Sequence, residues 1–441
     1  MSQHADALRA RLAAGPSSTG QLVDDLSLSR PQLALVLSEL GSALVGTRSA
    51  QSIQYALRDS ARGLPDIPIF RVEAEGRLRQ LGILIAVCPE GFVTRLAGGM
   101  AQHSVKLPWW LFDMRPQGYL GRTFAARQGA TLQLSGRLTE WTDAHALRAL
   151  IAHGHDVVGN LLLGETARDR FLASPPPAPI SEEQKAEAYP RLAREAARGN
   201  IPGPSAGGEQ PKFTAYVSTP SGPRHVIVKF NERVSGPAAE RWRDLLLAEH
   251  LALETLCEAG IPAARTRLVD HGHQRFLEVE RFDRMGALGR RGLFSLAALG
   301  AGPGGWPCIA RGLVATGHIR SEAADGAELL WAFGTLIGNT DMHNGNLSFL
   351  SEHGHPYAIA PAYDMTPMGF RPHSDGGLSD TLPEASIHAY VANRSWRQAG
   401  ELARTFLAKC TAAKFSRRFG ACLSALEQHI KTASQRIDRL R

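Results

Sequence analysis

In the first forty residues, apolar positions recur with the spacing of short amphipathic helices. Helix-like runs cover residues 5–12, 17–26 and 29–40, and the third begins at a natural capping serine. Two β-like runs then flank the polar segment 47–52. Helices joined by a tight turn and followed by a hairpin are typical of a winged helix, whose last helix reads DNA. We therefore predict a winged-helix domain over residues 1–62.

From residue 66 to residue 172 the pattern changes to short runs separated by glycines. The runs at 81–87, 91–95 and 130–136 are typical of strands, and they predict a small β-rich subdomain over 66–172. The aromatic segment 109–112 is expected to pack in its core rather than to form a ligand cage, because large aromatic side chains are mostly buried.

A proline-rich segment, residues 173–181, predicts a stiff linker to the rest of the chain, residues 182–441. Beyond it, a β-branched run predicts a strand that ends near Lys229. The leucine-rich run 243–259 predicts a helix that carries Glu249. A lysine near a strand end is by default a solvated charge, and so is a helical glutamate. Pairing of the two is the functional alternative.

Asp341, Asn346 and Asp364 form a spaced set of oxygen ligands. Phosphoryl transfer requires one carboxylate that orients a hydroxyl, an amide five residues later on Mg²⁺, and a second carboxylate on the same metal. Apolar runs at 332–337 and 347–350 place the loop between packed elements, as a catalytic loop requires. The competing interpretation is an ordinary polar turn, where Asp, Asn and Gly also cluster.

Upstream of the predicted strand, residues 203–212 combine adjacent glycines with polar side chains. Such glycines let backbone N–H groups approach phosphate oxygens closely. The segment is neither a Walker A sequence nor the Gly-x-Gly-x-x-Gly of eukaryotic-type kinases, so a flexible loop is the alternative. Residues 276–284 alternate like a strand and end in charges, where an adenine can hydrogen-bond to backbone.

Five motifs in this order resemble the HipA serine/threonine kinases of bacterial toxin–antitoxin systems. They lie between residues 203 and 367 and read Ser-x-x-Gly-x-Gln-Pro-Lys, Val-Lys-Phe, Glu-Arg-Phe-Asp-Arg, Asn-Thr-Asp-x-His-x-x-Asn and Tyr-Asp-Met-x-Pro. The resemblance implies an α+β multidomain chain with a two-lobed, protein-kinase-like catalytic domain and a helical C-terminal lobe. It also implies ATP and Mg²⁺ as cofactors.

Carried over residue by residue, the resemblance implies Asp341 as catalytic base and Asn346 and Asp364 as Mg²⁺ ligands. Lys229, supported by Glu249, would hold the ATP phosphates. The other ATP-contacting positions are Ser205, Gly207, Gly208, Gln210, Lys212, Glu280 and Phe282, the last two at the adenine hinge. Ser205 matches a serine that family members autophosphorylate to shut the kinase off, because a phosphate there repels the ATP phosphates. Without the resemblance, it is an ordinary turn serine.

HipA proteins ordinarily depend on a separate DNA-binding antitoxin, so the fused winged helix resembles the single-chain subfamily typified by the YjjJ/HipH proteins. Arg30, Arg48 and Arg58 are the basic residues best placed for phosphate, and Gln32 faces a groove in this interpretation. Because the region is close to charge-balanced, a three-helix protein-interaction module is the alternative. Winged helices commonly read symmetric sites as dimers, which is a reason to consider a homodimer.

The net charge of +7 and the pI near 9.3 suggest an anionic partner. Between residues 404 and 441, nine Lys and Arg against two acids supply an excess equal to that whole surplus. Apolar residues run through this stretch at helical spacing, which favours amphipathic helices with a solvated basic face. A nucleic-acid footprint is the alternative.

The five cysteines lie far apart and form no Cys-x-x-Cys pair, which fits reduced thiols in the cytoplasm. The N-terminus has no signal-peptide core and the apolar runs are too short to cross a bilayer, so we expect neither export nor membrane insertion.

Together these patterns predict a protein serine/threonine kinase of toxin type that binds DNA through its winged helix. The resemblance implies protein substrates such as enzymes of the translation machinery. One alternative is a DNA-binding transcriptional regulator whose kinase fold has weak turnover or only senses a ligand. Another is a Mg²⁺-dependent nucleic-acid-processing enzyme or a small-molecule phosphotransferase that uses the same acidic ligands.

Overall fold

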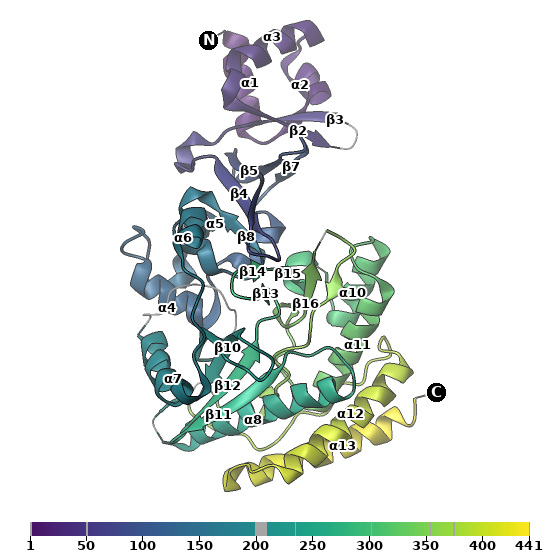
Figure 1. Cartoon of the computed structure of the whole chain (residues 1–441). Helices are drawn as coiled ribbons and strands as arrows, with labels where there is room; N and C mark the ends of the chain where they lie inside the picture. The colour runs from purple at the N-terminus through teal and green to yellow at the C-terminus, as the bar shows by residue number, and fades with distance from the viewer. Residues whose placement is uncertain are drawn as a thin grey trace.

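The computed structural model describes residues 2–49, 52–198, 210–233, 235–300, 302–352, 354–373 and 375–440. The predictions for Ser205, Gly207 and Gly208 lie outside these ranges, and the side chain of Arg48 is not among the described atoms. Figure 1 shows the N-terminal helices at one end of the molecule, a sheet below them, and the C-terminal half, coloured from teal to yellow, at the other end.

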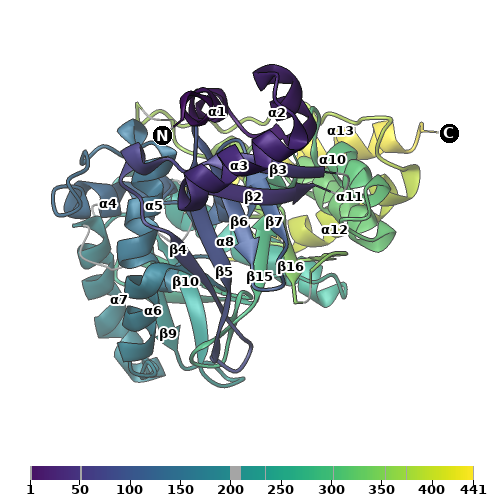
Figure 2. The same cartoon turned by 90° about the horizontal axis from the view of Figure 1, so that it is seen from above.

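The N-terminal domain is the winged helix that the sequence predicts. Helices α1 (Gln3–Ala13), α2 (Thr19–Leu26) and α3 (Arg30–Leu40) are followed by the hairpin β2 (Leu44–Ser49) and β3 (Ser52–Leu57), with β1 (Ser17–Ser18) on the far side of β3. Ser29 and Gln32 form a capping box that fixes the start of α3. Leu8, Leu22 and Leu33 share the core. Seen from above, the three helices lie nearest the viewer, and the sheet of the next domain lies behind them (Figure 2).

A five-stranded antiparallel sheet of order β7-β6-β5-β4-β8 forms the middle domain. Its strands are β4 (Ile67–Val72), β5 (Leu78–Val87), β6 (Gly91–Leu96), β7 (Ala101–Ser104) and β8 (Leu161–Leu163). The helices of this domain are α4 (Gly118–Gln128), α5 (Asp143–His153) and α6 (Gly164–Ala173). Leu84 of the sheet and Leu147 and Leu150 of α5 pack in one core. The strands predicted at 81–87 and 91–95 are confirmed.

The strand predicted at 130–136 is wrong, because these residues form turns that fold back on the end of α4. The Leu134 N–H donates to the carbonyl of Gly129 over 2.7 Å. A Cβ atom at Gly129 would lie 2.7 Å from the carbonyl oxygen of Ser135, so the close return needs glycine. Gln133 has a φ of 55°, outside the strand region. The alternating leucines of this segment therefore belong to a turn in which the side chain of Leu134 is buried.

A four-stranded antiparallel sheet of order β11-β12-β10-β9 forms the first lobe of the C-terminal half. Its elements are β9 (Lys212–Val217), β10 (Arg224–Phe230), β11 (Thr266–His271), β12 (Gln274–Glu280), α7 (Glu182–Ala197) and α8 (Pro237–Glu258). Phe276 packs with Tyr189 of α7, whereas the next residue, Leu277, packs with Leu246 of α8. Because successive strand residues point to opposite faces, the two helices cover opposite faces of the sheet.

The second lobe is mainly helical. It contains α10 (Trp306–Ala315), α11 (Ser321–Leu336), α12 (Asn393–Ala412) and α13 (Gly420–Ile437), with a small sheet of β15 (Gly292–Ser295), β16 (Ser348–Ser351) and β17 (Ala358–Ile359). Phe406 and Ile430 are buried in its core, which confirms the amphipathic helices near the C-terminus. Lys409 forms ion pairs with Glu254 and Glu258 of α8, at 2.6 and 2.7 Å.

None of the described helices is both long enough and apolar enough to cross a membrane.

Candidate active site

Lys229 and Glu249 form a buried ion pair between β10 and α8. The Nζ atom of Lys229 lies 2.6 Å from Oε1 of Glu249. Only 7% of the lysine side chain and 1% of the glutamate side chain are exposed. Burial raises the pKa of Glu249 above its ordinary value, and the ammonium of Lys229 opposes that rise. Neither residue is therefore the solvated charge that its local sequence context suggests.

Asp364 approaches the same ammonium from the second lobe and forms an ion pair with Lys229. Its φ is 54°, a left-handed conformation that is uncommon outside glycine and recurs at functional sites. The side-chain amide of Asn339 donates to the Asp364 carbonyl over 3.1 Å and holds this backbone in place. Burial opposes the charge of Lys229, but Asp364 and Glu249 together raise the pKa of its ammonium. The lysine thus stays protonated.

The loop that follows α11 is shaped by its own side chains. The Asp341 N–H donates to Oδ1 of Asn339 over 3.0 Å, and Nδ2 of Asn346 donates to the Asp341 carbonyl over 2.8 Å. Nε1 of Trp306 donates to the His343 carbonyl over 3.1 Å. The backbone of the loop is therefore held from both sides. The Asp341 side chain itself keeps 42% of its surface exposed.

These groups border a cleft between the two lobes. Its polar end is lined by Lys212, Lys229, Asn346 and Asp364. Its other end is mostly apolar and is lined by Ile227, Val279, Phe282 and Leu293. A second hollow continues from the polar end and adds Gln210 and Asp341. This arrangement suits a ligand with a flat apolar part and a polyanionic part.

Glu280 and Phe282 lie where the chain leaves β12 for the second lobe. The Glu280 carboxylate forms an ion pair with Nε of Arg224 at 3.1 Å, which balances its charge. The ring of Phe282 packs against Tyr363, with the ring centroids 5.7 Å apart. Both residues border the cleft, at the position expected for an adenine hinge.

Comparison with known proteins places the chain in a family. Residues 204–436 match the HipA-like C-terminal domain, and residues 64–172 match the middle domain of YjjJ-like toxins. Toxin YjjJ of Escherichia coli (strain K12) is 38% identical over 403 residues, which cover 90% of each chain. The chain belongs to the YjjJ-like branch of the HipA-like toxins.

The fold of this YjjJ-like chain is shared with HipA. In a solved structure of the toxin–antitoxin system of Shewanella oneidensis MR-1, which contains HipA, HipB and operator DNA, the matching chain superimposes with a TM-score of 0.51 and 16% sequence identity. The match covers 85% of this chain and 99% of that chain. The multidomain α+β architecture with a two-lobed, kinase-like half is thereby confirmed.

The residues predicted to contact DNA are placed differently from one another. Arg30 is exposed at the start of α3. Oε1 of Gln32 accepts from the Ser29 N–H over 2.9 Å. In this YjjJ-like chain the Gln32 carboxamide therefore serves first as a helix cap. Arg58 forms an ion pair with Asp66 at the junction with the middle domain. Arg30 is therefore the best placed of the three described side chains to meet DNA.

Several residues of the site escaped the sequence analysis. Thr366 donates to Oε2 of Glu249 over 3.1 Å, and Asn339 holds Asp364. Asn339 lies inside the Asn-Thr-Asp motif, which was a usable signal. Phe112 was expected in the core, and it instead lines the cleft, whereas its neighbour Leu111 is buried as expected.

Proposed function

We propose that this chain is a Mg²⁺- and ATP-dependent protein serine/threonine kinase of HipA toxin type. The observation that carries the proposal is the ammonium of Lys229, held between Glu249 of the first lobe and Asp364 of the second. In kinases, a strand lysine fixed by a helix glutamate contacts the α- and β-phosphates of ATP. The apolar end of the cleft, bordered by Phe282, would then receive the adenine.

Asn346 and Asp364 suit a Mg²⁺ ion. The Nδ2 atom of Asn346 is used by the Asp341 carbonyl, which leaves Oδ1 for a ligand. Burial opposes the charge of Asp364, but Lys229 and Lys212 lower the pKa of its carboxyl, so it is ionised at neutral pH. Such oxygen donors are those that Mg²⁺ prefers. When bound, the ion would neutralise charge on the phosphoryl group during transfer.

Asp341 is the proposed catalytic base. Its backbone is fixed by Asn339 and Asn346, while its partly exposed carboxylate borders the hollow that continues from the polar end of the cleft. A protein hydroxyl that enters this hollow can donate its proton to the carboxylate as the oxygen attacks the γ-phosphate. A serine or threonine substrate fits this role, and we infer that some substrates belong to the translation machinery, as the family resemblance implies.

Autophosphorylation at Ser205 is part of the proposal and rests on the motif that this serine shares with HipA kinases. If this serine lies beside the ATP phosphates, as the resemblance implies, a phosphate on it adds negative charge where the cleft is proposed to receive a polyanion. We therefore infer that the modification lowers kinase activity.

We further propose that the winged helix binds DNA through the exposed N-terminal end of α3, with Arg30 at a backbone phosphate. The solved HipA complex contains both HipB and operator DNA, whereas here the winged helix lies in the same chain as the kinase-like half. A symmetric operator would bring two copies together, so a homodimer on DNA belongs to this proposal.

Incubation with γ-labelled ATP and Mg²⁺ tests the kinase. Wild type should transfer label to Ser205 and to protein substrates, and Asp341→Asn should transfer at least about 100-fold less. Ser205→Ala is the matched control, because it should lose the self-label and keep transfer to other proteins. If wild type slows the migration of DNA in a gel but transfers no label, the result would favour a regulator whose kinase fold only senses a ligand. A cleaved DNA product would favour a nucleic-acid-processing enzyme.

A further inference from the structure

We propose that the middle domain supplies part of the nucleotide-base site, with Phe112 as a stacking surface and Gln117 as a polar contact to the edge of the base. The inference rests on the proposed binding of ATP in the cleft. It assigns a ligand-binding role to a domain that lies outside both kinase lobes and precedes them in the chain.

The first observation is the lining of the apolar end of the cleft. Phe112, Gln117 and Val158 of the middle domain border the same space as Ile227 and Phe282 of the kinase-like half. Gln117 precedes α4 without capping it, and its side chain makes no hydrogen bond within the described residues. Its amide donor and acceptor are thus available to the polar edge of a ligand in the cleft that Phe112 also lines.

The second observation is that the segment carrying Phe112 is clamped to the second lobe. Asp113 accepts from both the N–H and the hydroxyl of Ser295, each over 2.6 Å. The rings of Trp109 and Phe294 meet edge to face, with centroids 5.0 Å apart. Within the middle domain, the guanidinium of Arg115 lies over one face of the Phe112 ring, 4.4 Å from its centroid. Contacts of its neighbours with the second lobe and this contact together hold Phe112, whose other ring face is the one proposed to stack on a base.

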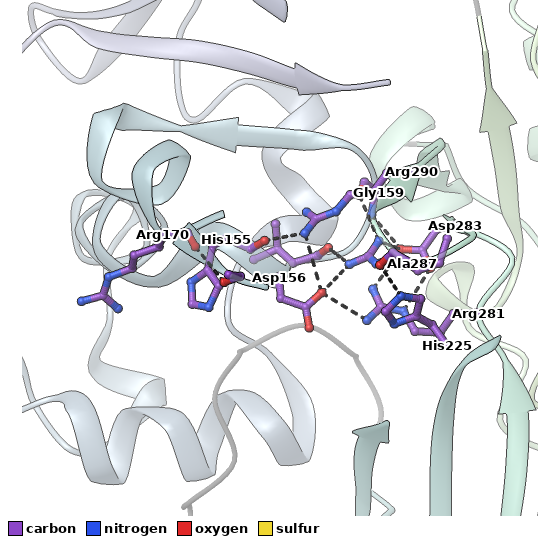
Figure 3. Close-up of polar contacts among 12 residues, drawn as sticks. His155, Asp156, Gly159, Arg170, His225, Arg281, Asp283, Ala287 and Arg290 are labelled. Atoms are coloured by element: carbon purple, nitrogen blue, oxygen red, sulfur yellow. Dashed lines mark hydrogen bonds and ion pairs between the residues drawn. The ribbon is translucent and has the colours of Figure 1, made fainter. Parts of the chain in front are cut away.

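The third observation concerns Val158, because the residues on either side of it take part in a network of charged groups; Figure 3 labels Asp156 and Gly159 of this network. Nη2 of Arg284 donates to Oδ1 of Asp156 and to the Val157 carbonyl, both over 2.7 Å. The Gly159 N–H donates to Oδ2 of Asp283 over 3.1 Å. Figure 3 shows Asp156 and Asp283 from the two domains with guanidinium groups between them. The contacts of its two neighbours, Val157 and Gly159, therefore fix the position of Val158.

These contacts have a chemical consequence for the ligand. A slot bounded by Ile227 of the first lobe and Leu293 of the second receives another wall from the middle domain. An aromatic ring can stack on any nucleotide base, whereas a side-chain amide distinguishes hydrogen-bond donors from acceptors on the edge of the base. The middle domain would thus contribute both affinity for the base and discrimination among nucleotides.

The test measures binding to the full chain rather than catalysis. Titration calorimetry compares MgATP with magnesium tripolyphosphate, which lacks base and sugar, for wild type, Phe112→Ala and Gln117→Ala. The control is Met100→Ala in the same domain, where the side chain is 69% exposed. Circular dichroism and thermal melting verify that each variant folds. Gln117→Ala changes a partly exposed residue in extended conformation before α4, so the proposal can still be tested if Phe112→Ala does not fold.

We expect Phe112→Ala to weaken MgATP binding about tenfold, the effect of losing one stacked base contact. Gln117→Ala should weaken it about fivefold through loss of one hydrogen bond. Tripolyphosphate affinity should stay unchanged in both variants, and Met100→Ala should match wild type with either ligand.

Unchanged MgATP affinity in both cleft variants, with wild type binding ATP, would overturn the assignment of the base site and leave the kinase proposal standing. Equal weakening of MgATP and tripolyphosphate would also overturn it, because the loss would then not concern the base. Absence of ATP binding by wild type would overturn the proposed function and this inference together.

Discussion

The hydroxyl of Thr366 donates to Oε2 of Glu249 over 3.1 Å, across the boundary between the two lobes. Lys229 takes the other oxygen of the same carboxylate, so both oxygens of this buried group have partners. Thr366 lies two residues after Asp364, which contacts Lys229 as well. The helix glutamate, the strand lysine and the second carboxylate are therefore placed by one connected set of contacts.

Glu249→Ala should lower the free energy of unfolding by about 3–5 kcal/mol, because it removes one partner of a buried pair and leaves the charge of Lys229 less compensated. Urea denaturation measures the change. Glu254→Ala is the control, since its pair with Lys409 is partly exposed and should cost about 0–1 kcal/mol. Equal losses in the two variants would contradict the buried pair.

Thr366→Val should lower the free energy of unfolding by about 1 kcal/mol through loss of one buried hydrogen bond. It should also lower kcat for phosphoryl transfer, because Glu249 and the segment after Asp364 would be held less firmly. Denaturation and steady-state kinetics measure the two effects. Thr405→Val, in which an exposed hydroxyl bonds within α12, should change neither quantity. A kcat equal to wild type would argue against a positioning role.

Asp341→Asn should reduce phosphoryl transfer by at least about 100-fold, the scale of a lost general base. Binding of MgATP and the free energy of unfolding should stay near wild type, because the carboxylate is partly exposed. Transfer of labelled phosphate measures catalysis, and calorimetry measures MgATP binding. Asp325→Asn, at an exposed ion pair with Arg394, serves as the control. Label retained by Asp341→Asn would remove this residue from the mechanism.

Stability should fall in acid because of Asp283. Burial opposes its charge, but Arg281 and Arg284 lower the pKa of its carboxyl well below the ordinary value. A carboxyl with a depressed folded pKa contributes stability that is fully present above its unfolded pKa of about 4 and is lost as pH falls further. Urea denaturation from neutral pH downward should show this loss in wild type.

Asp283→Asn should be less stable than wild type at neutral pH and should lose less stability below about pH 4. Asp169→Asn, at an exposed ion pair with Arg168, should keep the wild-type pH profile. Parallel profiles for wild type and Asp283→Asn would show that another group governs the acid transition.

Arg30→Ala should weaken binding to operator DNA and reduce the slope of log affinity against log salt by about 1, as expected for one lost phosphate contact. Fluorescence anisotropy over a salt series measures both quantities. Arg77→Ala changes an arginine whose side chain is 81% exposed in the middle domain, and it should leave both unchanged. A wild-type slope for Arg30→Ala would place the DNA contact elsewhere.

The local features of this chain follow from its sequence because they depend on neighbours a few residues away. The capping serine before α3 and the turn residues between Asp341 and Asn346 act within one helical turn or one loop. The family motifs add the expectation of the kinase-like half. The failure at 130–136 has a physical reason as well, since alternating leucines describe a turn with one inward side chain as readily as a strand.

What the tertiary structure alone decided are the contacts between residues far apart in the chain. The sequence left the pairing of Lys229 with Glu249 open beside two solvated charges, and only packing of α8 on the sheet decided for the pair. Asp113 meets Ser295 across 182 positions, which turns Phe112 from an expected core residue into a lining of the cleft. The type of a residue determines which interactions its side chain can make, but which partner it meets depends on how distant segments of the chain pack.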